Sequence, residues 1–236
     1  MVASRLAKRL LHYGLQSYGD YFQLLNNRQY PYEFQLMINI LTTNETYFFR
    51  EPQHFDFVHE QIIKPWRGDN FRLWSAASST GEESYSLGML LMEFMGVKKW
   101  EIFASDVNTD VLEAARKGVY LMNRLENMNP RYLEKYCLKG VRSQEGYFRI
   151  DEKIRQRVRF EQVNLKAQLP KHLGLFDVIF LRNVLIYFDK ETKQDVVKRV
   201  VSALKPGGHF FISHSETLHG LTVDLQMIKP SIYKKP

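Results

Sequence analysis

Hydrophobic positions in the first fifty residues follow the spacing of helices. Val2, Leu6 and Leu10 recur on one face of a predicted helix. The basic residues that share another face are Arg5, Lys8, Arg9 and His12. Such a basic stripe is either a solvated surface or a docking face for an acidic helix. A second segment with helical spacing precedes a polar, linker-like stretch at residues 42–45.

From residue 71 onward, short apolar runs alternate with helical patterns. The predicted strands are residues 71–75, 101–105, 176–181 and 209–213, and the predicted helices are residues 83–95, 109–117 and 191–204. This alternation is typical of an α/β fold, a doubly wound and mostly parallel sheet with helices on both faces. We therefore expect a helical domain with its linker over residues 1–45 and an α/β domain over residues 46–236.

The stretch from residue 132 to residue 160 interrupts this alternation. Strand-like pieces lie at residues 147–150 and 158–160, and Gly140 and Gly146 supply turn residues. These features predict a small antiparallel β insertion at about residues 132–160.

Composition excludes several classes of protein. The chain has 236 residues, of which 44% are hydrophobic and 25% charged, as in ordinary globular proteins. No apolar run approaches the roughly 18 residues of a membrane helix, so we expect no direct membrane insertion. Cys137 is the only cysteine, which favours a cytoplasmic location, and the seven histidines lack metal-binding spacing, so we expect no metal. The net charge of +7 favours an acidic partner without saying which kind.

The turn after the first strand, residues 76–81, lies where a nucleotide-like ligand binds in a doubly wound sheet. It lacks the G-x-G-x-x-G pattern that holds a pyrophosphate, and Glu82 and Glu83 open the following helix. Two carboxylates there suit a cationic ligand, such as a sulfonium with an α-ammonium group. Alternatively, they complement the positive end of the helix dipole.

Polar residues also follow the other predicted strands. Asp106 ends the second strand, where an acidic side chain binds ribose hydroxyls in dinucleotide folds, although an isolated aspartate there is also a common turn residue. Asn183 and Tyr187 follow the strand at residues 176–181. Asn183 suits the amino-acid part of the ligand. Tyr187 lies either at the reacting centre or in the core.

Seven segments in one order resemble the chemotaxis receptor methyltransferases, the CheR family, over nearly the whole chain. They are LTTNETYFFRE at 41–51, WSAASSTGEESYS at 74–86, ASD at 104–106, VNL at 163–165, RNVLIYFD at 182–189, LKPGG at 204–208 and SHSE at 213–216. Each segment alone is weakly specific, whereas the complete ordered set is highly specific. The resemblance implies a Rossmann-like methyltransferase domain at residues 46–236.

The resemblance implies methyl transfer from S-adenosylmethionine to glutamate side chains in the cytoplasmic region of chemotaxis receptors. S-adenosylhomocysteine is the expected second product. The residues implied to border the cofactor are Asn44, Thr46, Arg50, Glu83, Asp106, Asn164, Leu165, Asn183 and Val184. Arg50 and Tyr187 are implied to face the transferred methyl group. Nucleic acid is not an expected partner.

Two residues depart from the family pattern. Ala77 stands where many members have Gly, and Ser84 stands where Pro is usual. The N-terminus also begins further into the helical domain than is usual, a pattern typical of a truncated chain. For receptor docking we expect Arg5, Lys8 and Arg9 on the basic helix, with the β insertion as a rival anchor. The alternative functions are a methyltransferase for RNA or another protein, and a non-catalytic S-adenosylmethionine sensor.

Overall fold

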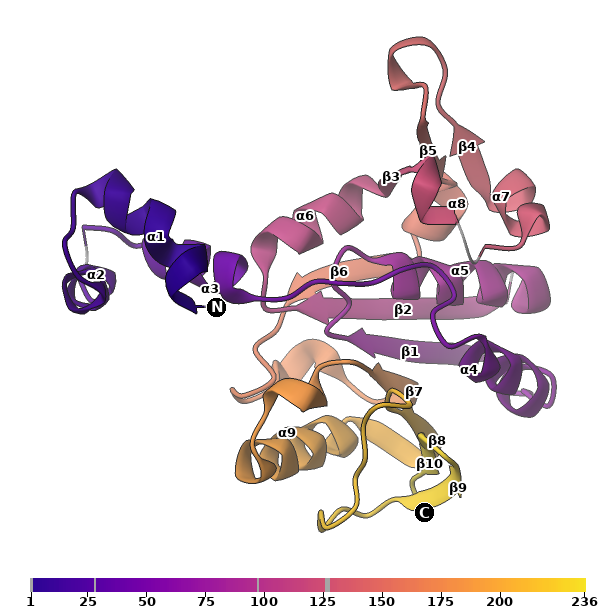
Figure 1. Cartoon of the computed structure of the whole chain (residues 1–236). Helices are drawn as coiled ribbons and strands as arrows, with labels where there is room; N and C mark the ends of the chain where they lie inside the picture. The colour runs from indigo at the N-terminus through magenta and orange to yellow at the C-terminus, as the bar shows by residue number, and fades with distance from the viewer. Residues whose placement is uncertain (1, 28, 97, 126–127) are drawn as a thin grey trace.

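A seven-stranded sheet forms the centre of the computed structural model, which describes residues 2–27, 29–96, 98–125 and 128–236 (Figure 1). Met1 and Arg28, which belong to the predicted helical domain, lie outside the described residues. The strand order is β6-β2-β1-β7-β8-β10-β9. The strands are β1 Asn70–Ala76, β2 Lys99–Asp106, β6 Val158–Gln162, β7 Phe176–Leu181, β8 Leu204–Phe211, β9 Gln226–Lys229 and β10 Ile232–Lys234.

The first five strands in this order are parallel, and two antiparallel strands complete the sheet at the β8 side. The doubly wound, mostly parallel sheet is therefore confirmed. The strand predicted at residues 209–213 begins earlier, at Leu204, and ends at Phe211. Its early residues gain ladder partners: Leu204 is in register with Phe176 of β7, and the pairing shifts register before His209.

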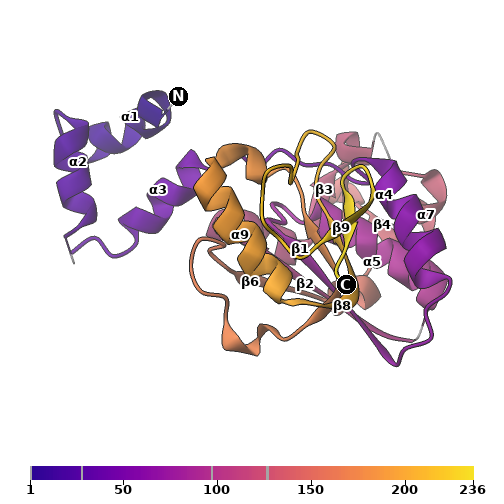
Figure 2. The ribbon, with the colours of Figure 1, turned by 90° about the horizontal axis from the view of Figure 1, so that it is seen from below.

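Helices cover both faces of the sheet. Period-two alternation along β7 directs Val178 and Phe180 into one core, and Ile179 and Leu181 into the other. The first core also includes side chains of α4 Pro52–Phe57, a π-helical turn at Val58–Ile63, α5 Glu82–Met95 and α6 Thr109–Lys117. Valines of α9 Lys190–Ser202 fill the second core, and Figure 2 shows α9 on that side.

A small antiparallel sheet stands beside the main one, in the order β3-β5-β4 (Figure 1). Its strands are β3 Val119–Leu121, β4 Cys137–Lys139 and β5 Tyr147–Ile150, and the neighbouring helices are α7 Pro130–Tyr136 and α8 Glu152–Arg155. The prediction of a strand at residues 147–150 is confirmed. The assignment of residues 158–160 to the insertion is wrong, because Val158–Gln162 pairs in parallel with β2 at the edge of the main sheet. Buried Val158 and Phe160 join the main core instead.

The described part of the N-terminal helical region contains α1 Val2–Tyr13, α2 Tyr18–Leu25 and α3 Glu33–Leu41. They project from the end of the sheet beside α6 (Figure 1). The Asn39 side chain of α3 donates to Thr109 Oγ1 at 2.8 Å, and Asn108 Nδ2 donates to Thr42 Oγ1 at 2.7 Å. These bonds fix the end of α3 to the start of α6. Across the described residues, each helix is too short or too polar to cross a membrane.

Candidate active site

A cavity of about 460 Å³ opens where the carboxyl ends of β1, β2 and β7 meet. This is the position at which open α/β sheets bind ligands. All the predicted catalytic and cofactor residues line it: Asn44, Thr46, Arg50, Glu83, Asp106, Asn164, Leu165, Asn183, Val184 and Tyr187. The fold therefore gathers at one cavity side chains that come from five separate segments of the chain.

The turn after β1 forms one wall of the cavity, and its backbone is strained. Ala77 and Ser79 adopt φ of 61° and 49°, in the left-handed region that favours glycine, and Gly81 follows at 93°. Ala77, which stands where the resemblance noted above has Gly in many members, thus keeps a glycine-like backbone at a steric cost. Ser79 Oγ donates to the Asn44 carbonyl at 2.8 Å, which ties this turn to the linker after α3.

Asp106 holds the same turn from the end of β2. Its Oδ2 accepts from the Ser79 amide at 2.9 Å, and its Oδ1 accepts from the Asn108 amide at 3.0 Å. The turn role considered from the sequence is therefore present, and the side chain also lines the cavity. Burial raises the pKa of this carboxyl, although the backbone amides oppose that shift. Each carboxylate oxygen keeps a further lone pair for a ligand hydroxyl.

Arg50 lies in a strained segment that several contacts hold in place. Its neighbours Phe49 and Glu51 have φ of 53° and 59°, an uncommon conformation for such residues. The Phe49 amide donates to Ser86 Oγ at 2.9 Å, which fixes this segment to α5. The Arg50 guanidinium donates to the Glu45 carbonyl at 3.2 Å and lies 5.3 Å from the Tyr47 ring. The segment thus directs Arg50 to the cavity wall.

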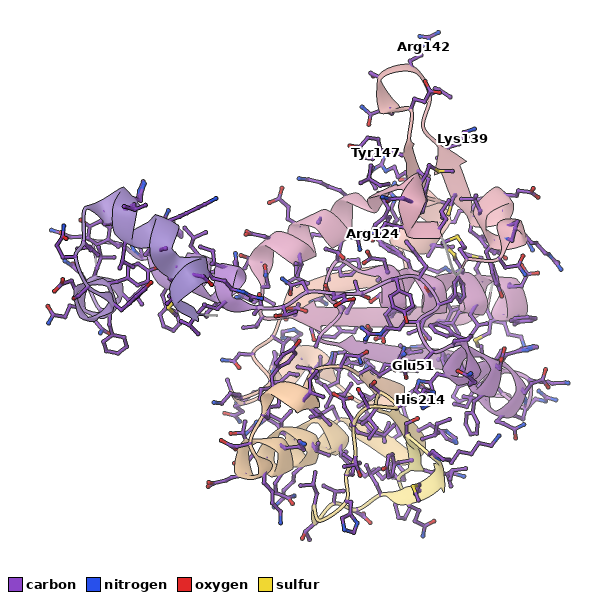
Figure 3. All side chains as sticks on the ribbon, viewed as in Figure 1. Glu51, Arg124, Lys139, Arg142, Tyr147 and His214 are labelled. Atoms are coloured by element: carbon purple, nitrogen blue, oxygen red, sulfur yellow. The ribbon has the colours of Figure 1, made fainter. Side chains whose placement is uncertain are left out.

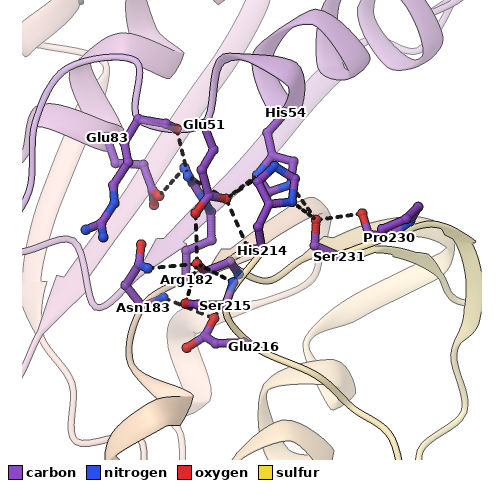
Figure 4. Close-up of polar contacts among 12 residues, drawn as sticks. Glu51, His54, Glu83, Arg182, Asn183, His214, Ser215, Glu216, Pro230 and Ser231 are labelled. Atoms are coloured by element: carbon purple, nitrogen blue, oxygen red, sulfur yellow. Dashed lines mark hydrogen bonds and ion pairs between the residues drawn. The ribbon is translucent and has the colours of Figure 1, made fainter.

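Buried Arg182, just after β7, is the centre of the contacts behind Arg50. Its Nη2 donates to the Arg50 carbonyl at 2.7 Å and lies 3.0 Å from Glu51 Oε2. Its Nη1 donates to Glu83 Oε2 at 3.1 Å. Figure 4 shows the guanidinium between the two carboxylates. Burial raises the pKa of the Glu83 carboxyl, and Arg182 opposes that rise. Arg182 therefore positions Arg50 through the backbone.

Asn183 also has a left-handed backbone, with φ of 58°. Glu216 holds this turn, because its carboxylate accepts from the amides of Asn183 at 3.1 Å and Leu185 at 2.7 Å. The Asn183 side chain donates to Ser213 Oγ at 2.8 Å (Figure 4). The SHSE segment thus fixes Asn183, which lines the cavity, although Ser213 and Glu216 are not among the described lining residues.

Tyr187 and Glu82 bear on two alternatives left open by the sequence. The Tyr187 side chain is 58% exposed, so the interpretation of a buried core aromatic is wrong. Glu82 is buried and accepts from Thr80 Oγ1 and Arg124 Nη1, at 2.6 Å and 3.2 Å. It is not among the described residues that line the cavity, whereas Glu83 is. Of the two carboxylates that open α5, only Glu83 is therefore among the described residues that line the cavity.

The predicted docking residues lie on α1, away from the cavity lining that the structure describes. Lys8 is exposed, but the other two side chains have internal partners. Arg9 forms a two-pronged ion pair with Glu33, at 2.8 and 2.6 Å, and Arg5 donates to the Leu41 and Thr42 carbonyls. The expectation of one exposed basic face is therefore wrong for Arg5 and Arg9, because α1 uses their charge to pack on α3.

Sequence reasoning missed the residues that support the site from behind. Arg182, Glu51 and Glu216 each lie inside a recognised segment, but their partners are distant in the sequence. The Arg182 to Glu83 contact spans 99 residues, and Ser213 donates to Glu51 Oε1 across 162 residues. A charged residue within an apolar strand end was the available signal for Arg182. Its two carboxylate partners could not be identified without the fold.

The lining suits S-adenosylmethionine. Glu83 and Asp106 are carboxylates of the lining, a group that can stabilise positive charge and accept from hydroxyls. Val107 and Leu165 supply apolar walls of the kind that hold an aromatic base. The volume of about 460 Å³ is within the range of small-molecule cavities.

Comparisons with known proteins agree with this chemistry. Residues 44–234 match the family described as CheR methyltransferase, SAM binding domain, and residues 1–42 match CheR methyltransferase, all-alpha domain. The chemotaxis protein methyltransferase of Salmonella typhimurium is 41% identical, over 99% of this chain and 81% of its own length. The Escherichia coli protein of the same name is 43% identical, over 94% of this chain and 81% of its own length.

Among solved structures, an O-methyltransferase family protein from Burkholderia thailandensis is 18% identical, with a TM-score of 0.43 over 69% of this chain and 37% of that chain. The family matches together span almost the whole sequence, and they place the S-adenosylmethionine-binding domain over the cavity described above. The chain belongs to the CheR family of S-adenosylmethionine-dependent methyltransferases.

Proposed function

We propose that this protein methylates glutamate side chains in the cytoplasmic region of chemotaxis receptors and acts in the cytoplasm. Two relatives more than 40% identical are named chemotaxis protein methyltransferases. The observation that carries the proposal is Arg50, a cation held at the wall of the cofactor cavity, with exposed Tyr187 on the same lining. A carboxylate is the substrate group that such a cation favours. The proposed division places the helical domain at residues 1–45 and the methyltransferase domain at 46–236.

The chemistry requires positioning more than acid or base catalysis. A free glutamate has a pKa near 4.3, so its carboxylate is already ionised at pH 7 and needs no general base. When bound, S-adenosylmethionine supplies an electrophilic methyl group on a sulfonium and leaves as S-adenosylhomocysteine. Arg50 orients the substrate carboxylate through charge-assisted hydrogen bonds, and Tyr187 lines the approach and limits water.

The other proposed contacts hold the cofactor. Asp106 accepts from ribose hydroxyls, while Glu83 and Asn183 bind the amino-acid part and its positive charge. The remaining members of the proposed cofactor lining are Asn44, Thr46, Arg50, Asn164, Leu165 and Val184.

The test of this function is transfer of labelled methyl groups to a receptor cytoplasmic fragment, followed by mild alkali. Glutamate methyl esters release methanol under those conditions, whereas N-methyl and ribose O-methyl groups do not. Label that survives alkali would instead support a methyltransferase for RNA or for another type of protein side chain. Cofactor binding without turnover on any receptor fragment would support a sensor.

The structure sharpens the test of the cofactor contact. We expect Asp106→Ala to weaken S-adenosylmethionine binding more than about tenfold, because a charged hydrogen bond to the ribose is lost. Isothermal titration of the purified protein measures this affinity. Asp110→Ala is the matched control, because Asp110 is exposed on the first turn of α6.

Asp106→Asn separates ligand binding from turn support, because the amide oxygen still accepts from a backbone amide while the negative charge is lost. Thermal unfolding of all three variants reports whether the turn survives. An Asp106→Ala protein with unchanged cofactor affinity would show that the ribose ligand is another residue.

Receptor docking on the basic helix remains part of the proposal, with exposed Lys8 as its residue, because Arg5 and Arg9 are held by internal partners. Reversing all three charges would also break the Arg9 pair with Glu33, so the sharper variant is Lys8→Glu. We expect it to raise the KM for the receptor fragment about two- to fivefold, the scale of one exposed ion pair. The effect should shrink as salt screens the contact.

Lys198→Glu is the matched control, since it makes the same charge change on an exposed position of α9. Cofactor affinity should stay constant in both variants. If both reversals raise the KM equally, net charge rather than α1 determines receptor binding. If neither does, and changes to the small sheet raise the KM, that sheet is the docking surface.

A further inference from the structure

Three side chains outside the cavity bring potential metal ligands together. They are Glu51, His54 on α4 and His214 in the loop after β8, and one ligand atom of each lies within 4.8 Å of the others. His54 Nδ1 lies 3.4 Å from Glu51 Oε2, and His214 Nε2 lies 3.9 Å from the same oxygen. Figure 3 shows Glu51 and His214 close together, and Figure 4 shows all three.

The Ser231 hydroxyl contacts one ring nitrogen of each histidine. Its oxygen lies 2.6 Å from the Pro230 carbonyl, 2.8 Å from His54 Nε2 and 3.1 Å from His214 Nδ1. A carbonyl only accepts, so the single hydroxyl hydrogen of Ser231 goes to Pro230. In that arrangement both histidines donate N–H to the Ser231 oxygen.

A neutral imidazole donates from one nitrogen only, so His54 Nδ1 and His214 Nε2 present lone pairs. Both lone pairs face Glu51 Oε2, itself an acceptor. His54 is fully buried, and its Nδ1 makes no hydrogen bond within the described structure.

Carboxylates outnumber guanidinium groups beside these ligands. Two carboxylates, Glu51 and Glu83, contact the single guanidinium of Arg182, which leaves one negative charge in this group. The ring nitrogens that face away from Glu51, His54 Nε2 and His214 Nδ1, both contact Ser231. Metal sites use such outer partners to orient the imidazole. His214 is 46% exposed, so an ion has a path to the site from solvent.

We propose that Glu51, His54 and His214 bind a divalent transition-metal ion of the zinc class. Two imidazole nitrogens and one carboxylate oxygen are a ligand set that such ions prefer over magnesium or calcium. Water supplies the remaining position on the exposed side. The expectation of no metal rested on the spacing of histidines along the chain. These two histidines are 160 residues apart and meet only in the fold.

Zinc titration of the chelator-treated full chain tests this site. We expect one Zn²⁺ per chain by calorimetry and elemental analysis, and a higher melting temperature with zinc than without. Replacing zinc with Co²⁺ should give the visible absorption of a low-coordinate nitrogen and oxygen site. These readouts do not depend on methyl transfer.

His214→Gln is the variant of choice, because His214 is partly exposed while His54 is buried in the core. It should weaken Zn²⁺ binding at least about tenfold and abolish the zinc-dependent rise in melting temperature. His219→Gln, an exposed histidine in the same loop, is the matched control and should bind like the parent protein. Equal zinc affinity in the parent and His214→Gln, or no stoichiometric zinc on the parent, would overturn the proposal.

Discussion

Arg50→Ala is expected to reduce the methyl-transfer rate about 100-fold, the scale on which misplacing a reacting group by about 1 Å acts. The backbone of this segment is held mainly by Ser86 and Arg182, and the Arg50 side chain adds one long hydrogen bond to the Glu45 carbonyl. The variant should therefore fold and melt like the parent. Single-turnover transfer to a receptor fragment, at saturating S-adenosylmethionine, measures the loss of rate separately from cofactor binding.

Two control variants show what the loss means. Arg50→Lys keeps the charge but not the planar set of donors, so it should recover only part of the rate if orientation matters. Lys166→Ala removes another cation of the cavity lining and should change the rate little. Near-parent turnover in Arg50→Ala would assign the substrate carboxylate to a different residue.

The sheet and the cavity were predictable because both depend on local patterns. Apolar runs fix the strands, and the polar residues that follow them must lie at the carboxyl edge of a parallel sheet. Asp106 and Asn183 reach the cavity for that reason. The strand at residues 158–160 was assigned to the wrong sheet, because its alternation fits either one. Only its partner β2 distinguishes them, and strand pairing is not encoded locally.

The basic helix shows the same limit for charges. Spacing places Arg5, Lys8 and Arg9 on one face, but it cannot tell whether that face meets solvent or another helix. Glu33, nearly fully buried, accepts from Arg9, Tyr13 and Tyr21 and joins α1, α2 and α3. The Arg9 contact holds the pKa of Glu33 below its usual range, despite the opposing effect of burial. A charge that neutralises an internal partner contributes to folding instead of docking.

Arg182→Leu is expected to destabilise the protein by about 3–5 kcal/mol, the scale of breaking a buried ion pair from one side. Arg182 is only 4% exposed, and the leucine would leave Glu51 and Glu83 facing each other without their shared cation. Urea unfolding at pH 7 measures the change. Arg182→Lys should cost less, because it keeps the charge and loses only the geometry of the guanidinium.

The dependence on pH identifies the cause of that loss. In the folded parent, burial raises the pKa of Glu51. Arg182 and Ser213 lower that pKa by more, so the net pKa lies below the usual value. The stability from this carboxylate is therefore present above the unfolded pKa of about 4.3 and is lost as the pH falls through the folded pKa. In Arg182→Leu the unpaired carboxylates should have raised pKa values, so protonation should relieve the repulsion between them.

The difference in free energy of unfolding between the parent and Arg182→Leu should narrow from pH 7 towards pH 5, and Glu83→Gln should restore part of the lost stability at pH 7. A gap that is constant with pH and unaffected by Glu83→Gln would mean that Arg182 acts through packing, not through charge.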